Sequence, residues 1–570
     1  MFRHHQPQEF HNEDRKAYFV GGGIGSLSAA FFLIRDAKFK PENITIFEAL
    51  HVNGGSMDGC GDPEHGYIIR GGRMFNLPTY ECLQDMLKDI KSVHHPEKTA
   101  YEELHEFTHE CKTHSNSRVV DHNRQKYDVR CMGFDMGDRL SLLALVNTDE
   151  DKLGKSKISE HFGPHFFTTN FWYMWATTFA FQPWHSAAEF RRYLLRFMHE
   201  FVRIETLEGV ARSELNQYDS VILPLEKDLR AKDVVFENDS RVTDVDVSVD
   251  KTTDRKVAKS ITITHSDGKT EQVNLREEDL IFIQNGSMTD AASVGTHTEP
   301  AKFLTKEDGT SWQLWEKLSK LSKDFGDPEP FFGCVPESVW QSFTVTINND
   351  TSFFDQEIAW SGNEPGTGAL VTFKDSNWLM SIVVAKQPHF LNQPPTTQVF
   401  WGYGLFPDRV GNFVHKRMID CTGEEILEEL IGHLRFDKST IKNAICRPCI
   451  MPFITAQFMC RNRSDRPLPV PKGSVNIAFT SQFVEIPDDV VFTVEYSVRA
   501  SQTAVYQLCG VKDRKIPRVH HYEYRPKFMV KALIKSFSHT AWQTCFRATL
   551  GAAAVGAVAY GVKKYLDSKK

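Results

Sequence analysis

Two arginines, two adjacent glycines and an asparagine lie close together in YIIRGGRMFNLPTY, the segment that spans residues 67–80. Adjacent glycines between an apolar run and a proline turn indicate backbone that can approach a ligand closely. Arg73 offers a charge at this point, and the amide of Asn76 can both donate and accept hydrogen bonds. Met74 lies between them, where a reacting centre would gain from a charge, although a thioether cannot accept a proton at neutral pH. The segment predicts a ligand site and leaves open what Met74 does there.

A second group of small residues predicts a site for a dinucleotide. The segment KAYFVGGGIGSLSAAFFLI, residues 16–34, has the pattern of a strand, a glycine turn and a helix. Gly21 and Gly23 fill the first two positions of the G-x-G-x-x-G pattern, and Ser26 takes the third, where a small residue still lets helix and strand pack. The helix is expected to begin near Gly25, so that its first N–H groups can hold a pyrophosphate.

The next strand, NITIFEA, ends in Glu48 and specifies the type of dinucleotide. A carboxylate at this position accepts hydrogen bonds from both ribose hydroxyls and repels a 2′-phosphate, which favours FAD or NAD(H) over NADP(H). A further glycine cluster with Gly55 and Ser56 follows at once, as it does in many two-domain flavoproteins. The order of these segments favours FAD over a diffusible nicotinamide.

Two later segments are expected to return to the same cofactor. In residues 277–293 an apolar strand leads into a loop with Asn285 and Ser287, the usual construction for backbone that passes close to a cofactor. The alternative is an ordinary strand-to-helix turn. Residues 473–508 again combine strand, polar loop and helix, and Phe483 in that loop is expected to close over the flavin ring. The nucleotide domain is therefore predicted to be discontinuous in sequence.

Aromatic residues are concentrated in residues 162–184, which contain ten of them. A helical pattern follows, with Phe190, Leu194, Phe197 and Phe201 on one predicted face. These side chains form either a thick core beneath a helical subdomain or the wall of a pocket for a long apolar ligand. The composition does not decide between the two.

Composition sets the broad class of the protein. A chain of 570 residues with 41% hydrophobic content can bury a large core, and its length suggests two to four globular domains. The eleven cysteines lack paired metal-ligand spacing, and the polar start MFRHHQPQEFHNEDRK has no apolar signal segment. Neither a metal site nor secretion is expected.

The C-terminal residues 511–570 are basic, with 13 Lys and Arg against 3 Asp and Glu. They contain the uncharged run ATLGAAAVGAVAYGV, whose ~22 Å length as a helix is short of a ~30 Å hydrocarbon core. A helix or hairpin on an anionic membrane surface is predicted instead, the alternative being a helix docked on the protein's own core. The expected membrane contacts are Trp542, Phe546, Lys563, Lys564, Lys569 and Lys570.

Taken in order, these segments resemble the oleate hydratases, FAD-dependent fatty acid double-bond hydratases also known as the myosin-cross-reactive antigen family. The resemblance covers nearly the whole chain and implies addition of water to the cis double bond of a free unsaturated fatty acid, such as oleic acid to 10-hydroxystearic acid. FAD is implied to be needed without net redox. The matching stretches include GGGIGSLSAAFFLIRDA, GGSMDG, RGGRMFNLPTYECLQDM, FWYMWATTFAFQPWHSAAEFRRYLLRF, LNQYDSVILPLEKDLRAKDVVFE, NGSMTDAASVG and FWGYGLFPDRVGNFVHKRMIDCTGEEILEEL.

The predicted fold is α/β, with a discontinuous Rossmann-like FAD-binding domain, an inserted substrate domain, a helical lid and a helical C-terminal tail. The FAD-binding domain is assigned to residues 15–150, 216–325 and 466–510. The aromatic helical lid is assigned to residues 151–215, the substrate-binding domain to residues 326–465, and the membrane-associating tail to residues 511–570.

Tyr218, in LNQYDSVILPL, matches the tyrosine that the family uses as proton donor. Hydration needs a proton on one alkene carbon and a water held at the other, so an acid and a polar clamp must flank the substrate. A neutral phenol has a pKa of about 10, so nearby charge or the flavin must assist it. Without the resemblance, a buried tyrosine that caps a local hydrogen bond is the simpler interpretation.

Most relatives carry a glutamate for water activation directly after RGGR, where this chain has Met74. Three explanations are open. Neighbours such as Arg73, Asn76 or a backbone carbonyl orient the water; another acid reaches the site; or hydration is weak or lost. For Arg73 and the two adjacent glycines, contact with FAD is the expected role. Glu81 is a doubtful substitute, because on a helix it would project about two turns away from Met74.

The segment RVGNFVHKR, residues 409–417, corresponds to the region where the family binds the fatty acid carboxylate. Asn412 is expected to donate a hydrogen bond, and Lys416 and Arg417 to add charge. Val410 stands where a hydroxyl residue is common in relatives, which weakens the correspondence. The alternative is a solvated basic turn.

The sequence thus predicts an FAD-dependent fatty acid hydratase of the cytoplasm, peripherally attached to anionic membranes, without nucleic-acid partners and with its oligomeric state open. One rival is a flavin oxidoreductase, an oxidase or desaturase on an apolar substrate, because the same frame supports redox chemistry. The other is a non-catalytic protein that binds fatty acid or membrane.

Overall fold

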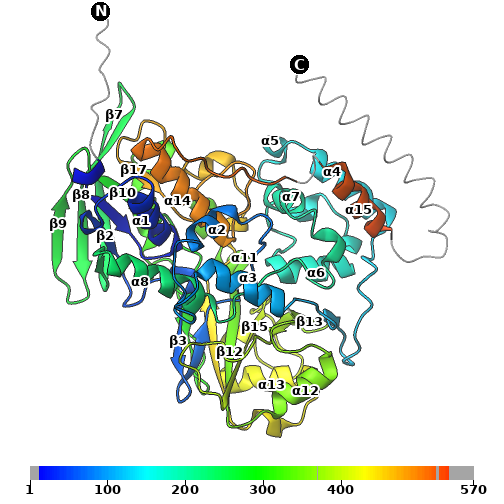
Figure 1. The fold of residues 1–570 in the computed structure, drawn as a ribbon. Coiled ribbons are helices and arrows are strands. Elements are labelled where there is room, and N and C mark those ends of the chain that lie inside the picture. Colours follow the sequence, from blue (N-terminus) through cyan, green and yellow to red (C-terminus); the bar gives the residue numbers. More distant parts are fainter. Residues whose placement is uncertain (1–11, 73, 369, 522–524, 538–570) are drawn as a thin grey trace, which may run out of the picture.

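The computed structural model describes residues 12–72, 74–368, 370–521 and 525–537 (Figure 1). One of its two large sheets is five-stranded and parallel, with the strand order β17-β10-β1-β2-β6. Strands far apart in sequence therefore lie side by side, which confirms the predicted Rossmann-like α/β class. The strands are β1 (Ala17–Val20), β2 (Ile44–Phe47), β6 (Val235–Glu237), β10 (Leu280–Ile283) and β17 (Ile477–Phe479).

Strands β1, β10 and β17 are apolar and buried at every position because both faces of the sheet are covered there, as is usual for parallel sheets. Phe19 and Phe282 face one cluster of buried residues, and Tyr18 and Ile281 face another. The first face is packed by α1 (Ile24–Arg35), α8 (Leu223–Ala231), α14 (Val494–Cys509) and α2 (Glu81–Leu87). A three-stranded antiparallel sheet adjoins the other face and consists of β7 (Ser240–Asp250), β8 (Arg255–His265) and β9 (Thr270–Asn274).

A second, seven-stranded sheet has the order β11-β16-β12-β15-β14-β13-β5 and is mainly antiparallel. The hairpin of β3 (Gly59–Asp62) and β4 (Gly66–Ile69) follows β2 of the first sheet in the chain and contacts β12 and β16 of the second sheet. Thr346 and Thr344 accept hydrogen bonds of 2.9 and 3.1 Å from the backbone N–H groups of Tyr67 and Ile69. Since β4 leads into Arg70, these bonds fix where the following glycines lie. The strands are β5 (Val119–Val120), β11 (Ser293–Val294), β12 (Trp340–Asn348), β13 (Val371–Phe373), β14 (Met380–Val383), β15 (Thr397–Gly404) and β16 (Ala444–Met451).

Two groups of helices lie beside the second sheet and in a separate helical region. The second sheet is packed by α12 (Ser352–Ser361) and α13 (Gly423–Leu434). The helical region at the upper right of Figure 1 consists of α4 (Met136–Asn147), α5 (Glu150–Leu153), α6 (Asn170–Phe179), α7 (Ala187–Arg196) and α15 (Pro526–Ser536). The remaining helices are α3 (Ala100–Glu110), α9 (Ser311–Ser319), α10 (Glu329–Phe332) and α11 (Val335–Ser338). No helix of the described chain combines the length and apolar character that a membrane span requires.

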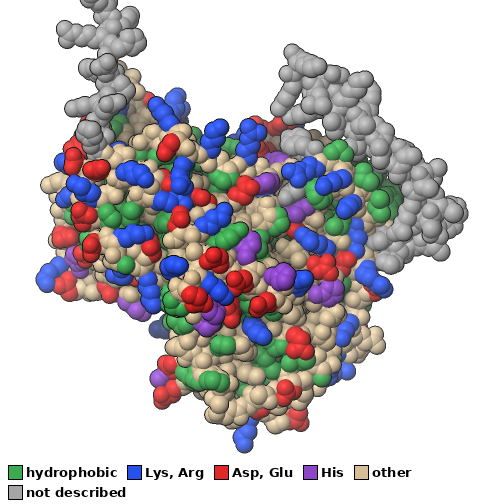
Figure 2. All heavy atoms as spheres, viewed as in Figure 1, with side chains coloured by type: hydrophobic (Ala, Val, Ile, Leu, Met, Phe, Trp, Pro, Cys, Tyr) green, Lys and Arg blue, Asp and Glu red, His purple; other side chains and the backbone are tan. Residues whose placement is uncertain are grey.

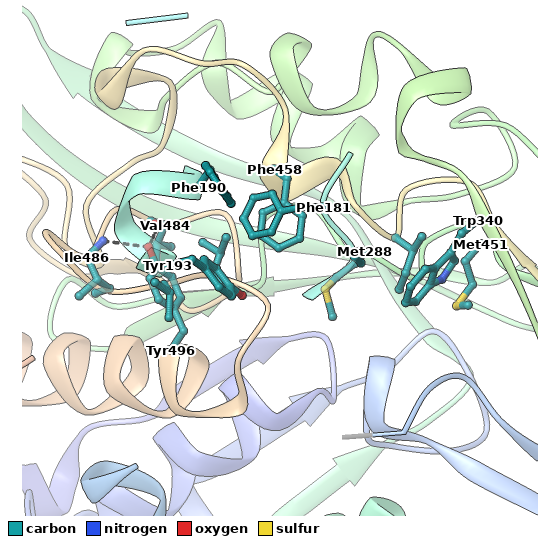
Figure 3. Packing of buried hydrophobic residues seen from close by; sticks show 14 of the residues in the cluster. Phe181, Phe190, Tyr193, Met288, Trp340, Met451, Phe458, Val484, Ile486 and Tyr496 are labelled. Atoms are coloured by element: carbon teal, nitrogen blue, oxygen red, sulfur yellow. Dashed lines mark hydrogen bonds between the residues drawn. The ribbon is translucent and has the colours of Figure 1, made fainter. Parts of the chain in front are cut away.

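Most of the aromatic segment is core. Phe181 and Phe458 stack with ring centroids 4.3 Å apart, and Phe190 and Tyr193 pack around them (Figure 3). The predicted helical face is only partly right, because α7 ends at Arg196 and the chain then continues in irregular turns. Those turns change which side chains can meet, and they place Glu200 where an unbroken helix would not.

Buried ion pairs tie this helical region to the loops that follow the second sheet. Arg192 donates to Glu150 at 2.7 Å and to Glu485 at 2.5 Å. Glu189 accepts from Arg461 at 2.7 Å and pairs with Arg466 at 3.0 Å. Burial alone would raise the pKa of Glu189, but the charges of Arg466 and Arg461 outweigh it and lower the pKa to about 2. Such a network fixes geometry, because removing one member leaves a buried charge without its partner.

Candidate active site

The glycine turn after β1 is shaped by close approaches that only glycine allows. Gly21 has a φ of +95°, and a Cβ on Gly25 would lie 2.0 Å from the carbonyl oxygen of Thr480. The N–H of Gly22 donates to Oε2 of Glu48 at 2.6 Å, so the carboxylate at the end of β2 lies against the turn. Burial raises the pKa of Glu48, and hydrogen bonds from the backbone N–H groups of Gly22, Leu50 and Ala49 oppose that shift. The glycine turn is therefore fixed next to the carboxylate of Glu48.

A cavity opens beside this turn. Five residues predicted to contact a cofactor line it together: Gly23, Gly55, Ser56, Ser287 and Phe483. The other predicted cofactor residues that the structure describes support the cavity from behind. Ser26 accepts a hydrogen bond from Gln284 at 2.8 Å, and Asn285 donates to the carbonyl of Phe483 at 3.1 Å. Arg73 lies outside the described residues.

The residues present fit a dinucleotide. Gly23 is the N-cap residue of α1 and provides no side-chain acceptor, so the first N–H groups of the helix remain available at the end that borders the cavity. Oδ1 of Asn53 is buried with no hydrogen-bond partner among the described residues, and a Cβ on Gly22 would lie 2.2 Å from it. Backbone donors, an unsatisfied amide and the carboxylate of Glu48 are the groups that recognise pyrophosphate and ribose.

A second cavity adjoins the first and contains Met74. It consists of two adjoining pockets, a larger and a smaller one, that share part of their wall. Phe492, Thr493 and Val494 line both the larger pocket and the nucleotide cavity. Residues shared by the two pockets are Met74, Tyr80, Thr178, Phe179 and Phe197. An apolar ligand in this cavity would lie next to one end of a bound dinucleotide.

Aromatic side chains form much of the wall of this Met74 cavity. Trp175 and Phe179 come from the aromatic segment, and Trp340 and Trp401 from the second sheet. Most rings of the aromatic segment are therefore core and a few face the cavity, while a long apolar ligand in that cavity stays a prediction.

A cluster of polar groups reaches the smaller pocket at Met74. Asn76 donates to Oε1 of Glu200 at 2.9 Å, and both residues line that pocket. Arg203 donates to the same carboxylate at 2.6 and 2.8 Å, and Nε2 of His199 lies 3.0 Å from it. Burial raises the pKa of Glu200, but these hydrogen bonds prevail and lower it to about 2. An ionised carboxylate thus lines the pocket whose wall contains Met74.

Glu200 was not identified from the sequence. It follows α7 in a stretch that reads as a continuing helix, and it contacts Asn76 only because the chain turns after Arg196. A Cβ on Gly209 would lie 1.6 Å from Oε2 of Glu200, so a glycine at 209 is required for this carboxylate to fit. Glu81, by contrast, is 45% exposed at the start of α2 and does not line the cavity.

Tyr218 lies behind the glycine segment rather than in the described wall of the Met74 cavity. It opens the helical turn Tyr218–Ile222, and the preceding Gln217 donates to the carbonyl of Gly71 at 2.7 Å. Burial, followed by the charges of Glu226 and Asp219, raises the pKa of Tyr218 to about 12. The tyrosines that line the cavity are Tyr80, Tyr193 and Tyr403.

The residues predicted to bind a carboxylate do not reach this cavity. Asn412 is exposed and binds the backbone of Asn377 at 2.7 Å. Lys416 pairs with Glu425 at 2.8 Å and Arg417 with Asp420 at 2.6 Å, both on the surface. These partners satisfy the three side chains locally, as in a solvated basic turn. The predicted membrane residues beyond 537 lie outside the described part of the chain.

A glycine-rich cavity beside the parallel sheet shares a wall with an apolar pocket, an arrangement that fits a dinucleotide next to an apolar ligand. The chain belongs to the MCRA family, whose sequence pattern matches residues 14–506.

Two characterised relatives share most of its length. It is 38% identical over 533 residues to "Oleate hydratase" of Streptococcus pyogenes serotype M49, which covers 91% of this chain and 89% of the relative. It is 36% identical over 567 residues to "Linoleate hydratase" of Lactiplantibacillus plantarum, which covers 92% of this chain and 98% of the relative. A solved oxidoreductase from Methanosarcina mazei superposes with a TM-score of 0.47 at 12% identity, over 86% of this chain and 100% of that one.

Proposed function

We propose that the protein is a fatty acid hydratase, which adds water to the cis double bond of a free unsaturated fatty acid such as oleic acid. The observation that carries the proposal is the wall of Phe492, Thr493 and Val494, which the nucleotide cavity and the Met74 cavity share. Relatives at 36–38% identity that are named oleate and linoleate hydratase support it. The hydroxy acid formed retains all atoms of substrate and water, so no net redox occurs.

FAD is the proposed cofactor. Gly21, Gly23 and Gly25 would receive its pyrophosphate, Glu48 its ribose, and Ser287 and Phe483 the end that approaches the shared wall. When bound, FAD supplies fixed ring dipoles beside an apolar pocket, where they act more strongly than in water.

The reaction breaks the π bond and one O–H bond of water, and forms one C–H and one C–O bond. We assign the proton on the alkene to Tyr218, on the family resemblance. We assign the water to Asn76 and Glu200, which lie 2.9 Å apart in the wall that contains Met74. Water that attacks a carbocation-like centre becomes strongly acidic, so even a weakly basic carboxylate such as Glu200 can take its proton. That proton returns through solvent to the Tyr218 phenolate, which restores both groups for the next turnover. Met74 then forms apolar wall, and the second of the three explanations above, another acid, is the one we favour.

The test is incubation of the FAD-loaded protein with oleic acid, followed by mass spectrometry of the products. A gain in mass of one water molecule supports hydration. A loss of two hydrogens identifies a desaturase, and binding without any product identifies a carrier.

Attachment to an anionic membrane surface is a second part of the proposal. Hydrophobic side chains reach the surface at the upper right of Figure 2, where Figure 1 places α4 and α15. Met136, Leu140 and Leu143 of α4 are more than half exposed, and Ile534 of α15 is 45% exposed. Lys527 and Lys531 are exposed on the same short helix. Apolar groups flanked by cations suit an anionic lipid surface.

An apolar cavity lies between α4 and α15. Leu143 and Met529 line it, and Trp175 lines both this cavity and the Met74 cavity. Sedimentation with phosphatidylserine vesicles tests the proposal, comparing wild type with Leu140→Asp. The matched control is Leu321→Asp, which changes a 44% exposed leucine elsewhere. Equal sedimentation of all three proteins contradicts membrane contact through α4.

A further inference from the structure

Two adjacent histidines, His94 and His95, lie in the turn between α2 and α3, and both rings approach the carboxylate of Glu214. Nε2 of His94 lies 3.7 Å from Oε1 of Glu214, and Nε2 of His95 lies 3.2 Å from Oε2. The ligand atoms that these three side chains offer all lie within 4.8 Å of one another. Glu214 follows His95 by 119 positions, so the fold, and not a local motif, brings the three together.

This geometry matches one face of a tetrahedral zinc site. Zinc binds imidazole nitrogen and carboxylate oxygen at about 2.0–2.2 Å, which places neighbouring ligand atoms ~3.3 Å apart. The 3.2 Å between His95 and Glu214 corresponds to one such edge, and the 3.7 Å of His94 needs only a small side-chain adjustment. Two imidazoles and one carboxylate suit zinc and similar transition metals, whereas magnesium and calcium prefer oxygen ligands.

The charges around the three side chains also favour a cation. Among the described residues, the ion pairs of Glu214 are with the two histidines, and neither a lysine nor an arginine neutralises its carboxylate. Glu97 adds a second carboxylate, whose Oε1 lies 3.7 Å from Nδ1 of His95. Histidines that bind zinc usually direct their other ring nitrogen toward a carboxylate or a carbonyl, which fixes the orientation of the ring. Glu97 occupies that supporting position for His95.

Hydrogen bonds of the turn hold both histidines in place. The backbone N–H groups of His94 and His95 donate to Oγ of Ser92 at 3.1 and 2.9 Å. Ser92 is buried, and its hydroxyl donates in turn to the buried carboxylate of Glu103. The carbonyl of His95 accepts from the N–H of Lys98 at 2.9 Å. Two ligands are therefore preorganised, so an ion that binds here has to order little additional backbone.

Solvent reaches the three side chains. Those of His94, His95 and Glu214 are 28, 34 and 29% exposed, and Glu214 also lines a surface pocket. An ion can therefore enter without unfolding of the chain, and water can complete the tetrahedron as the fourth ligand.

We propose that His94, His95 and Glu214 form a zinc site. None of the three lines the nucleotide cavity or the Met74 cavity, so the site does not depend on the proposed function. A bound ion joins the turn between α2 and α3 to the segment that leads into the helical turn at Tyr218, because Glu214 precedes Tyr218 by four residues. The cysteine spacing that argued against a metal site does not bear on these ligands.

The test measures zinc binding by the FAD-loaded protein after a chelator has been applied and removed. Isothermal titration calorimetry with Zn²⁺ gives the affinity and stoichiometry, and Mg²⁺ is the comparison ion. The variants are His95→Gln and Glu214→Gln. One control is His114→Gln, which breaks an exposed pair with Glu208 at 2.8 Å, and the other is His5→Gln, which changes another adjacent histidine pair of the sequence.

We expect one tight site for Zn²⁺ per chain, no binding of Mg²⁺ at the same concentration, and a thermal midpoint that rises by a few degrees when zinc saturates the site. His95→Gln and Glu214→Gln should each weaken zinc binding at least ~10- to 100-fold, the loss that follows when a residue that only supports a ligand is changed. Both controls should keep the wild-type affinity. The thermal midpoint of each metal-free variant, compared with that of metal-free wild type, shows that the variant is folded.

Zinc binding that is unchanged in both variants overturns the inference and assigns the ion elsewhere, for example to the group of Asp135, Asp138 and His165. A wild-type protein that binds no zinc also overturns it, because the three side chains are then an ordinary ion pair at the surface. Cobalt(II) in place of zinc gives a further check, since a thiolate charge-transfer band in its spectrum would assign the ion to cysteine.

Discussion

Phe75 and Ala211 exchange two backbone hydrogen bonds, of 2.9 and 2.8 Å, across 136 positions of the chain. This single bridge brings the glycine-rich segment after β4 beside the turns that follow α7. Met74 and Asn76 on one side thereby meet Arg212 and Glu200 on the other. The predictions below follow from that meeting and from the elements that hold it.

Glu200→Gln should lower kcat for oleic acid hydration about 10²- to 10⁴-fold, the usual contribution of a positioned proton acceptor, with little change in fatty acid affinity. Restoring a carboxylate by Met74→Glu in the same protein should recover part of the rate, because position 74 lines the same pocket. Glu208→Gln, at an exposed position eight residues away, is the control. A Glu200→Gln enzyme with the wild-type kcat would rule out our assignment of the water.

Tyr218→Phe should reduce kcat at least ~10²-fold if its phenol delivers the proton. The cavity offers a direct comparison, because Tyr80 and Tyr403 line it while Tyr218 does not. Single phenylalanine variants of all three tyrosines, assayed for kcat and KM separately, decide which phenol is the acid. Loss of activity in Tyr403→Phe with full activity in Tyr218→Phe would transfer the role.

Glu48→Gln should weaken FAD binding about tenfold, because a charged acceptor for the ribose hydroxyls becomes neutral. The two carboxylate oxygens also accept hydrogen bonds from the N–H groups of Gly22 at 2.6 Å and Leu50 at 2.9 Å. The amide of glutamine has a single oxygen, so it can keep only one of these two bonds. Flavin absorbance after gel filtration measures the retained cofactor. Glu42→Gln, an exposed change just before the same strand, should retain FAD fully.

Glu189→Gln should destabilise the fold by about 3–5 kcal/mol, because it leaves Arg461 and Arg466 buried beside a neutral group. Urea unfolding followed by circular dichroism measures the loss, with Glu208→Gln again as the surface control. A change below ~1 kcal/mol, typical of exposed pairs, would mean that the network carries little of the stability.

Acid should destabilise the protein in a defined range of pH. Glu189 and Glu200 have pKa values of about 2 in the fold against 4.5 in the unfolded chain, so folding favours their ionised forms. Their stabilisation is complete above about pH 4.5 and is lost progressively as the pH falls toward 2. The free energy of unfolding, measured in urea between pH 6 and pH 3, should therefore fall with pH in wild type and less steeply in Glu189→Gln.

Local patterns predicted the nucleotide half well. The strand, glycine turn and helix around Gly23 are encoded within twenty residues, and the apolar strands of a covered sheet are recognisable without their neighbours. Gly55, Ser287 and Phe483 could be placed together because the order of such segments is itself a pattern.

The polar groups of the second cavity could not be found in this way. Arg212 and Glu200 are charged residues in stretches without a motif, and in sequence they resemble surface positions. They face the cavity because of the long-range bridge at Phe75 and because the helix stops at Arg196. Asn412 was chosen from local resemblance, but it lies in an exposed turn. The carboxylate of Glu429 holds this turn by accepting hydrogen bonds from the backbone N–H groups of Asn412 and Phe413.

The strand order of the parallel sheet also bears on how the protein is made in the cell. β1 and β2 are synthesised first, but β10 emerges more than 230 residues later and β17, with α14, near residue 500. At ~5–20 residues per second a ribosome needs tens of seconds to bridge that interval. Until β6 and β10 emerge, the β1–β2 pair has both of its edges unpaired, so nascent chains should depend on chaperones until the last strand arrives.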